Sequence, residues 1–356
     1  MIVKEPDSFF YICSRSLFSC PRGSESFSGV RVQVFILCVE FDIIIPMSVI
    51  NQMERLADSC RTYGPLCVGL DTDPSYLPPE VLEKYESPSG AVLAYNRALV
   101  EATASHAGCY KVQIAYYEAM GLSGLKVYKE TLDFIKSKGK PVISDIKRGD
   151  IADTAKAYAK AHFCGDFETD IVTLNPYMGF ETLNPFVEEA EKRGKGIFVL
   201  LRTSNPGMTD IEKQELKAGG LVLDRVGSEI ERLRETFLSK QIIKSGDASP
   251  VGAVVGCTEE SDALDLRNKY PGIFFLIPGY GAQGGAARIA GTLLQNAGGT
   301  VNSSRGILLA WKKDPALTEK REAGGLTLEQ ITESAYKAAE ASAKELLEAK
   351  ALCSKA

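Results

Sequence analysis

The stretch Pro141-Val-Ile-Ser-Asp-Ile-Lys-Arg-Gly-Asp-Ile151 joins a short apolar run to three charges, Asp145, Lys147 and Asp150. The apolar run predicts a buried strand, and the residues after it predict a helix. Side chains alternate between the two faces of a strand, so Asp145 and Lys147 are expected to point the same way. A carboxylate beside an ammonium can hold the lysine protonated and aim it at a substrate. The alternative is a structural ion pair, followed by Asp150 as a helix N-cap.

Seven further apolar runs predict strands, and segments with apolar residues at helical spacing separate them. Strands that alternate with helices predict parallel βα units. Eight such units in about 300 residues are typical of the α/β class in its closed (β/α)8 form, the TIM barrel, and the alternative is an open, doubly wound sheet. The predicted strands are 66–71, 109–116, 141–147, 170–176, 196–204, 250–256, 273–279 and 299–304; predicted helices include 91–104, 122–137, 151–162, 181–193 and 327–352.

Composition argues against several kinds of partner. The net charge is −5 and no basic stripe is present, which disfavours nucleic acid. Two histidines, and nine cysteines without a C-x-x-C motif, leave little from which to build a zinc site. Scattered, unpaired cysteines are typical of a reduced, cytoplasmic protein.

Residues 1–46 differ from the rest of the chain in being rich in Phe, Ser and Cys. The apolar run 32–39 ends at Glu40 and is too short for a transmembrane helix, and no basic start or small-residue cleavage site marks a signal peptide. We therefore expect no membrane partner. We expect the barrel domain to span 47–356, with an amphipathic helix opening at Met47. Residues 1–46 are then a leader of unassigned role, either a targeting or disordered segment or the product of an upstream start site.

Polar residues follow most of the predicted strands at their C-terminal ends. In a (β/α)8 barrel these ends meet on one face, where the βα loops form the active site. Structural ion pairs scattered at random would not gather there, so we expect a functional site. The residues, in strand order, are Asp71, Lys111, Gln113, Asp145, Lys147, Asn175, Thr203, Ser204, Gln283 and Arg305.

The glycine-rich segment Gly279-Tyr-Gly-Ala-Gln-Gly284 matches G-x-G-x-x-G, a pattern that can mark a dinucleotide site. It lies too late in the chain to open a βαβ half, and no acidic residue follows about twenty positions later. Barrels commonly bind phosphate with the loops after strands seven and eight, and Arg305 offers a planar donor fork there. We therefore predict a phosphate site, with a tight turn and a surface arginine as the alternative.

Both histidines, His106 and His162, fall in helical stretches away from the strand ends. Acid and base chemistry at the predicted site is therefore left to lysine and carboxylate groups.

These motifs together resemble the orotidine 5′-phosphate decarboxylase family over about residues 50–350. The segment Asp145-Ile-Lys-Arg-Gly-Asp-Ile-Ala-Asp-Thr154 is similar to the family signature D-x-K-x-x-D-I-x-x-T, and Leu66-Cys-Val-Gly-Leu-Asp71 is similar to its first strand. The signature is shared with sugar-phosphate decarboxylases and synthases of the same superfamily. The resemblance becomes specific through Arg202-Thr-Ser-Asn-Pro-Gly207 and Asn302-Ser-Ser-Arg-Gly306. Lys111-Val-Gln113 and the Arg202 segment resemble a bacterial subgroup with a longer chain.

The resemblance implies a homodimer that decarboxylates orotidine 5′-monophosphate to UMP with neither metal nor cofactor. Lys147 is then the proton donor to C6, and Asp145 lies beside it. Asp71 and Lys111 are expected to hold the ribose hydroxyls, with Lys111 also counted in the catalytic set. The partner subunit is expected to supply Asp150, which is also counted in the catalytic set, together with Ile151 and Thr154.

The same resemblance assigns the rest of the substrate site. Ser204 is expected to contact the pyrimidine, while Gln283 and Arg305 bind the phosphate. Position 113 is often Asn in relatives and is Gln here. The remaining implied substrate-binding residues are Gln113, Thr203, Pro278 and Ser304.

Two other functions use the same residues. A metal-dependent sugar-phosphate lyase of the superfamily would need a further acidic ligand for Mg²⁺, and Glu118 is the nearby candidate. A barrel that binds nucleotide without catalysis is the other, and the intact Lys and Asp set argues against it.

Overall fold

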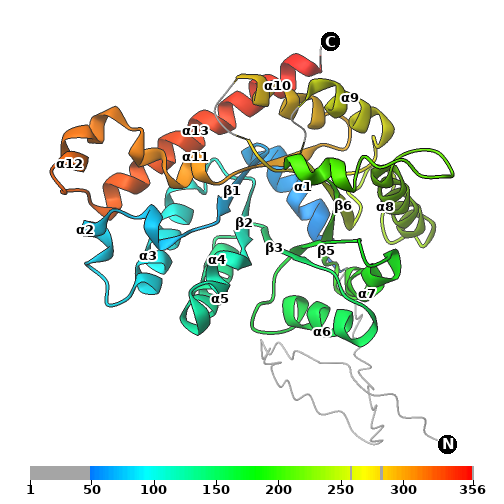
Figure 1. Cartoon of the computed structure of the whole chain (residues 1–356), viewed down its shortest axis with the longest axis horizontal. Coiled ribbons are helices and arrows are strands. Elements are labelled where there is room, and N and C mark those ends of the chain that lie inside the picture. The colour runs from blue at the N-terminus through cyan, green and yellow to red at the C-terminus, as the bar shows by residue number, and fades with distance from the viewer. Residues whose placement is uncertain (1–48, 257–258, 281–283, 355–356) are drawn as a thin grey trace, which may run out of the picture. The chain divides into compact units, whose positions relative to one another are not determined.

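The computed structural model describes residues 49–256, 259–280 and 284–354. Its sheet is a closed parallel barrel in which the strands follow one another in chain order (Figure 1). The predicted (β/α)8 fold and all eight predicted strands are thereby confirmed. The strands are β1 (Leu66–Leu70), β2 (Cys109–Gln113), β3 (Val142–Arg148), β4 (Ile171–Leu174), β5 (Gly196–Arg202), β6 (Val251–Val255), β7 (Phe275–Ile277) and β8 (Gly299–Ser303).

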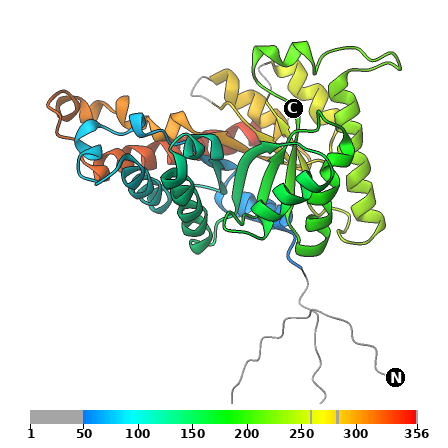
Figure 2. The same ribbon diagram turned by 60° about the horizontal axis from the view of Figure 1, so that its bottom comes forward.

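Helices follow the strands and surround the barrel (Figure 2). The five predicted helices are present, although the segment predicted from residue 181 opens with a 3₁₀ turn at 180–183. The helices are α1 (Gln52–Tyr63), α2 (Pro79–Leu82), α3 (Pro88–Thr103), α4 (Ile114–Glu118), α5 (Gly121–Ser137), α6 (Ala152–Phe163), α7 (Asn184–Arg193), α8 (Val222–Ser239), α9 (Glu260–Lys269), α10 (Gly284–Leu293), α11 (Arg305–Leu308), α12 (Thr318–Glu322) and α13 (Leu328–Cys353).

Several predicted boundaries differ from the observed ones by a few residues, and at two of them local capping explains the difference. The strand predicted to reach residue 116 ends at Gln113, whose side-chain oxygen accepts a hydrogen bond from the Ala115 amide and opens α4. The first helix begins at Gln52 rather than at Met47, because Asn51 caps it by accepting from the amides of Met53 and Glu54. In both places one polar side chain satisfies a helix amide that has no partner within the helix.

The sheet separates two apolar layers. The smaller one fills the barrel and joins Met53 and Leu56 of α1 to strand residues such as Cys67, Ile143 and Phe198. The larger one lies between the strands and the outer helices. Because apolar side chains fill the barrel toward α1, the opposite end of the strands is left to carry polar groups.

The C-terminal helix α13 packs against both α10 and α3 and so covers one side of the barrel (Figure 1). Its first turn has a capping box, in which Thr327 and Gln330 each bond the backbone amide of the other. None of the helices within 49–256, 259–280 and 284–354 combines the length and apolar character that a membrane span requires. Residues 1–46 lie outside the described part of the chain, so the domain boundary at residue 47 stays a prediction.

Candidate active site

The C-terminal ends of β1, β2 and β3 bring the predicted charged residues together. Lys111 lies opposite Gly69 in the β1–β2 register, and Gln113 lies opposite Asp145 in the β2–β3 register. Lys111 Nζ donates to Asp71 Oδ1 at 3.1 Å and to Asp145 Oδ2 at 3.0 Å. A continuous charged network therefore links three neighbouring strand ends above the apolar filling of the barrel.

Asp145 is the centre of this network and is 5% exposed. Its Oδ2 accepts from Lys111 and from Gln113 Nε2, the latter at 2.9 Å. Its Oδ1 accepts from Lys147 Nζ at 2.6 Å and from Thr173 Oγ1 at 2.8 Å. Four donors leave this carboxylate fully hydrogen-bonded, which fixes its orientation.

The electrostatics of the cluster keep its members charged. Burial alone would raise the pKa of Asp145, but the charges of Lys111 and Lys147 outweigh burial and hold that pKa well below its usual range. Burial would likewise lower the pKa of Lys111, yet Asp145 and Asp71 raise it above its ordinary value. Asp145 is consequently an anion, and Lys111 a cation, at neutral pH.

The two lysines differ in access. The Lys111 side chain is 5% exposed and lies between two carboxylates, whereas the Lys147 side chain is 46% exposed. Lys147 has a φ of 45°, which is a left-handed backbone conformation, and the β3–β4 register shifts between Ser144 and Arg148. The expected meeting of Asp145 and Lys147 is observed, but it occurs across a bulge and not along a regular strand.

Asp150 and Ile151 lie in the loop between β3 and α6, and Thr154 lies in the first turn of α6. Asp150 does not cap α6: the cap position is Ile151, and Asp150 Oδ1 accepts from the adjacent Ile151 amide at 2.8 Å. The capping alternative for Asp150 was therefore wrong. Gly149 lets this loop cross the next strand end, because a Cβ there would lie 2.5 Å from the Asn175 carbonyl oxygen. Ile151 and Thr154 are exposed.

The predicted hydroxyl residues Thr203, Ser204 and Ser304 directly follow the C-terminal ends of β5 and β8. Thr203 donates through Oγ1 to Glu212 at 2.6 Å, and its amide also bonds that carboxylate. Ser204 lies against Gly256 and Gly279, at the ends of β6 and β7. Ser304 accepts from Asn302 and lies over β1, where a Cβ on residue 69 would be 2.0 Å from its Oγ. Gly69 is thus required for Ser304 to occupy this place.

The predicted phosphate residues are only partly described. Arg305 is exposed at the start of α11, and Pro278 is half-buried after β7. Burial and a hydrogen bond with Tyr116 raise the pKa of Tyr76 to about 12, and the positive charge of Arg305 acts against this rise. Gln283 lies outside the described residues.

Two residues support the strand ends in ways that the sequence did not predict: Arg202, noted only as part of a family motif, and Thr173, which was not singled out. Arg202 is 2% exposed; it donates to the carbonyls of Thr203 and Gly256 and pairs with Asp262 at 3.0 Å. Thr173, at 1% exposure, bonds Asp145 and the backbone of β3. In the sequence, Arg202 and Thr173 are visible only as a basic residue and a hydroxyl residue within apolar runs. Such a pattern does not reveal that their partners are Asp262 and Asp145.

Glu118, the candidate metal ligand, lies in α4 and binds Arg148 at 2.6 Å. In the described part of the chain no group of three or more His, Cys, Asp or Glu side chains is arranged to hold a metal ion. The arrangement at the strand ends alternates carboxylate and ammonium groups, which suits an anionic, hydroxyl-bearing substrate.

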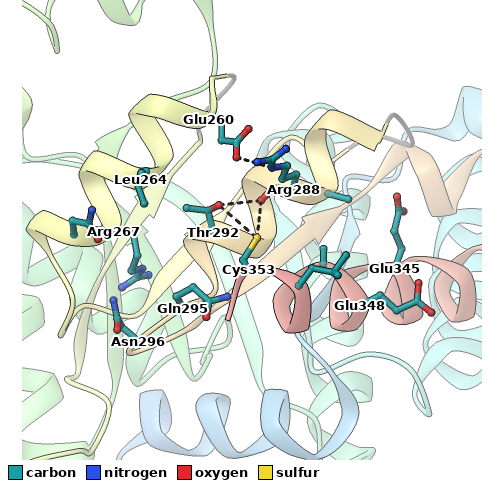
Figure 3. A pocket seen from close by; sticks show the side chains of 14 residues that line it. Glu260, Leu264, Arg267, Arg288, Thr292, Gln295, Asn296, Glu345, Glu348 and Cys353 are labelled. Atoms are coloured by element: carbon teal, nitrogen blue, oxygen red, sulfur yellow. Dashed lines mark hydrogen bonds and ion pairs between the residues drawn. The ribbon is translucent and has the colours of Figure 1, made fainter. Parts of the chain in front are cut away.

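Two cavities lie away from the charged cluster. One, of about 810 Å³, is on the outside of the barrel among α9, α10 and α13, where Glu260 pairs with Arg288 and Cys353 lies near Thr292 (Figure 3). The other, of about 570 Å³, lies beside the β4 and β5 loops and includes Thr203, Tyr177 and Met208. Neither contains Asp145 or Lys147.

His162 lies in α6, as predicted, whereas His106 lies in the turn that follows α3. His106 Nε2 lies 3.9 Å from Glu340 Oε1. His162 is 3% exposed in α6, and its Nδ1 has no hydrogen-bond partner within the described residues. Burial, together with the charge of Arg148, lowers the pKa of His162 to about 4.

This shift predicts a pH-dependent stability. Between roughly pH 6.5 and 4 the unfolded chain binds a proton at this position that the folded chain does not. His162 therefore removes stability as the pH falls through that window, by roughly 3 kcal/mol in total. Between pH 7 and pH 4 the free energy of unfolding should therefore fall by roughly 3 kcal/mol less in His162→Phe than in the wild type. Denaturant unfolding at each pH measures this difference. Parallel curves for the two proteins would contradict the assignment.

Known proteins match this chain over most of its length. The model described as "Orotidine 5′-phosphate decarboxylase / HUMPS family" matches residues 64–319. The orotidine 5′-phosphate decarboxylase of Clostridium botulinum strain Hall is 51% identical over 262 residues, covering 73% of this chain and 90% of the relative. The corresponding protein of Clostridium acetobutylicum is 50% identical over 263 residues, or 74% and 90% of the two chains.

Solved structures share the architecture. A Streptomyces avermitilis protein assigned to the same activity is 28% identical, with a TM-score of 0.66 over 86% of this chain and 98% of that one. The Leishmania donovani OMP decarboxylase, at 24% identity and a TM-score of 0.61, covers 85% of this chain and 99% of that one and shares the fold.

Proposed function

Because this chain belongs to the orotidine 5′-phosphate decarboxylase family, we propose that the charged cluster around Asp145 carries the family's reaction, with Lys147 as proton donor. The enzyme is a carboxy-lyase that converts orotidine 5′-monophosphate to UMP, the last step of de novo pyrimidine nucleotide synthesis. The observation that carries the proposal is the pairing of an anionic, fully hydrogen-bonded Asp145 with two lysines of very different exposure. Replacement of Lys147 tests it, since that change removes a charge and a proton together.

The proposed step breaks the bond between C6 and the carboxylate. Carbon dioxide leaves, the electron pair stays on C6, and a proton moves from Lys147 Nζ to C6. The ring offers this carbanion no position for delocalisation, so a fixed ammonium beside C6 stabilises the charge as it develops. Lys147 suits this role better than Lys111, because its side chain is 46% exposed and can regain a proton from solvent.

Asp145 has a double part in this proposal. It holds the Lys147 ammonium at 2.6 Å, and its low pKa keeps it ionised. Bound substrate would place its own carboxylate near this anion, so repulsion would raise the energy of the ground state and be relieved when carbon dioxide leaves.

The remaining contacts follow from the same geometry. Asp71 and Lys111 are adjacent and already hydrogen-bonded, which supports their proposed role on the two ribose hydroxyls. Ser204 at the end of β5 is proposed to contact the pyrimidine. Binding energy from these contacts, remote from C6, can hold the reacting ring in place. The other proposed substrate contacts are Gln113, Thr203, Pro278, Gln283, Ser304 and Arg305.

We further propose a homodimer that shares its active sites. The loops after β3 and β4 lie side by side and expose large apolar side chains: Ile151 is 51% exposed, Tyr177 76% and Met178 49%. Such a group of exposed apolar residues is typical of an interface. In the dimer Asp150, Ile151 and Thr154 reach into the partner's site, and the charge of Asp150 completes the row of alternating charges next to Lys147.

Mixing two inactive variants tests this shared site. Lys147→Ala and Asp150→Ala subunits, combined in equal amounts and allowed to exchange, should recover about a quarter of wild-type activity, because half of the dimers are mixed and each has one intact site. The activity of the mixture is measured against each variant alone.

A matched control is the mixture of Lys147→Ala with Asp145→Ala. Both residues come from the same subunit in the proposed site, so no combination contains an intact site and activity should stay absent. If exchange is demonstrated and the first mixture is as inactive as the second, the sites are not shared.

A further inference from the structure

The hydroxyl of Thr173, near the C-terminal end of β4, makes three hydrogen bonds. It accepts from the amides of Ile146 and Lys147, both at 3.0 Å, and donates to Asp145 Oδ1 at 2.8 Å. A threonine hydroxyl has one proton to donate. The two amides therefore leave that proton for the carboxylate, and every part of the hydroxyl has a defined partner.

These bonds lie where the backbone of β3 departs from regular geometry. Lys147 has a φ of 45°, and the register between β3 and β4 shifts between Ser144 and Arg148. The left-handed conformation is unfavourable for a residue with a Cβ, and amides at a bulge lose their strand partners. Thr173 supplies an acceptor to both amides, so it stabilises the turn that directs the Lys147 side chain toward Asp145.

We propose that Thr173 is a positioning residue for the reaction, which acts through Asp145 and Lys147 without touching the substrate. Thr173 holds the Asp145 carboxylate, which pairs with the Lys147 ammonium, and it also holds the backbone amide of Lys147. This inference rests on the proposed roles of those two residues. A displacement of about 1 Å at a reacting group can cost on the order of 100-fold in rate, so one hydroxyl at this position matters.

Thr173→Val, which keeps the shape and removes the hydroxyl, tests the proposal. We expect kcat to fall by roughly 10- to 100-fold while KM changes by less than about threefold. Phosphate and ribose contacts come from other strand ends, so binding should be preserved. Thr173→Ser, which retains the hydroxyl, should restore kcat to within about threefold of the wild type. If Thr173→Val does not fold, Thr173→Ala gives the same comparison.

Thr169→Val is the matched control. Thr169 is also fully buried, and its hydroxyl donates to the Val142 carbonyl at 3.2 Å. Val142 is the first residue of β3, at the end of that strand opposite to Lys147. This variant should lose a similar amount of thermal stability and keep its kcat. A Thr173→Val protein with wild-type kcat would overturn the proposal, as would a folded Thr173→Ser protein that is as slow as Thr173→Val.

The same assays separate this inference from the proposed function. If Lys147→Ala is inactive and Thr173→Val is normal, only the positioning role fails. If Lys147→Ala retains its activity, the proposed roles of Lys147 and Asp145 are wrong, independently of the result for Thr173→Val.

Discussion

Replacing Lys147 with alanine is expected to abolish turnover while the barrel stays folded. The change removes the ammonium that meets the developing carbanion and the proton that the product needs. Transition-state stabilisation should fall by at least ~4 kcal/mol, the scale of deleting a key electrostatic donor. The measurement is kcat from the loss of orotidine 5′-monophosphate, with the melting temperature recorded for the same samples.

Lys156→Ala provides the control for this experiment. Lys156 lies on the next helix, α6, with its side chain 67% exposed and its Nζ 2.9 Å from Asp153 Oδ1. Its removal should change neither turnover nor melting temperature. Near-normal turnover of Lys147→Ala would end the assignment of Lys147 as proton donor.

Replacing Arg305 with alanine is expected to cut kcat/KM strongly for the nucleotide and hardly at all for orotidine, the phosphate-free nucleoside. The guanidinium acts through a group that only the nucleotide carries. Charge-assisted contacts of this kind contribute roughly 1.5–3 kcal/mol each, and more where binding energy also holds a loop closed over the ring. The measurement is kcat/KM with both substrates.

A surface arginine of α7 serves as the control here. Arg193 is 54% exposed and pairs with Glu189 one turn away, so Arg193→Ala should leave both substrates unaffected. Equal damage to both substrates by Arg305→Ala would mean that Arg305 is structural and that the phosphate binds elsewhere.

The fold could be predicted from sequence because its signal is local and repeated. Eight apolar runs alternate with helical periodicity, and a closed parallel barrel is the arrangement that such a repeat favours. The errors were at element ends, where one side chain decides the outcome. Gln113 and Asn51 each bond an amide and start a helix, and a pattern of apolar residues does not record that choice.

Much of the candidate site could also be predicted, because strand ends of a barrel meet on one face. The contacts among Asp71, Lys111, Asp145 and Lys147 follow from that rule. The bulge at Lys147 does not, since it depends on the pairing of β3 with β4 and on a hydroxyl 26 positions away in the chain. The burial of Arg202 against Asp262 is equally a matter of tertiary contacts.

The most direct test of the account is a spectrophotometric assay of the purified protein with orotidine 5′-monophosphate, run with and without EDTA. We expect the protein to consume the substrate, to form UMP in equal amount, and to do so at the same rate with and without EDTA. Conversion that EDTA abolishes would instead indicate a metal-dependent lyase built on the same Asp and Lys frame. Binding of the nucleotide with no conversion at all would contradict the account directly.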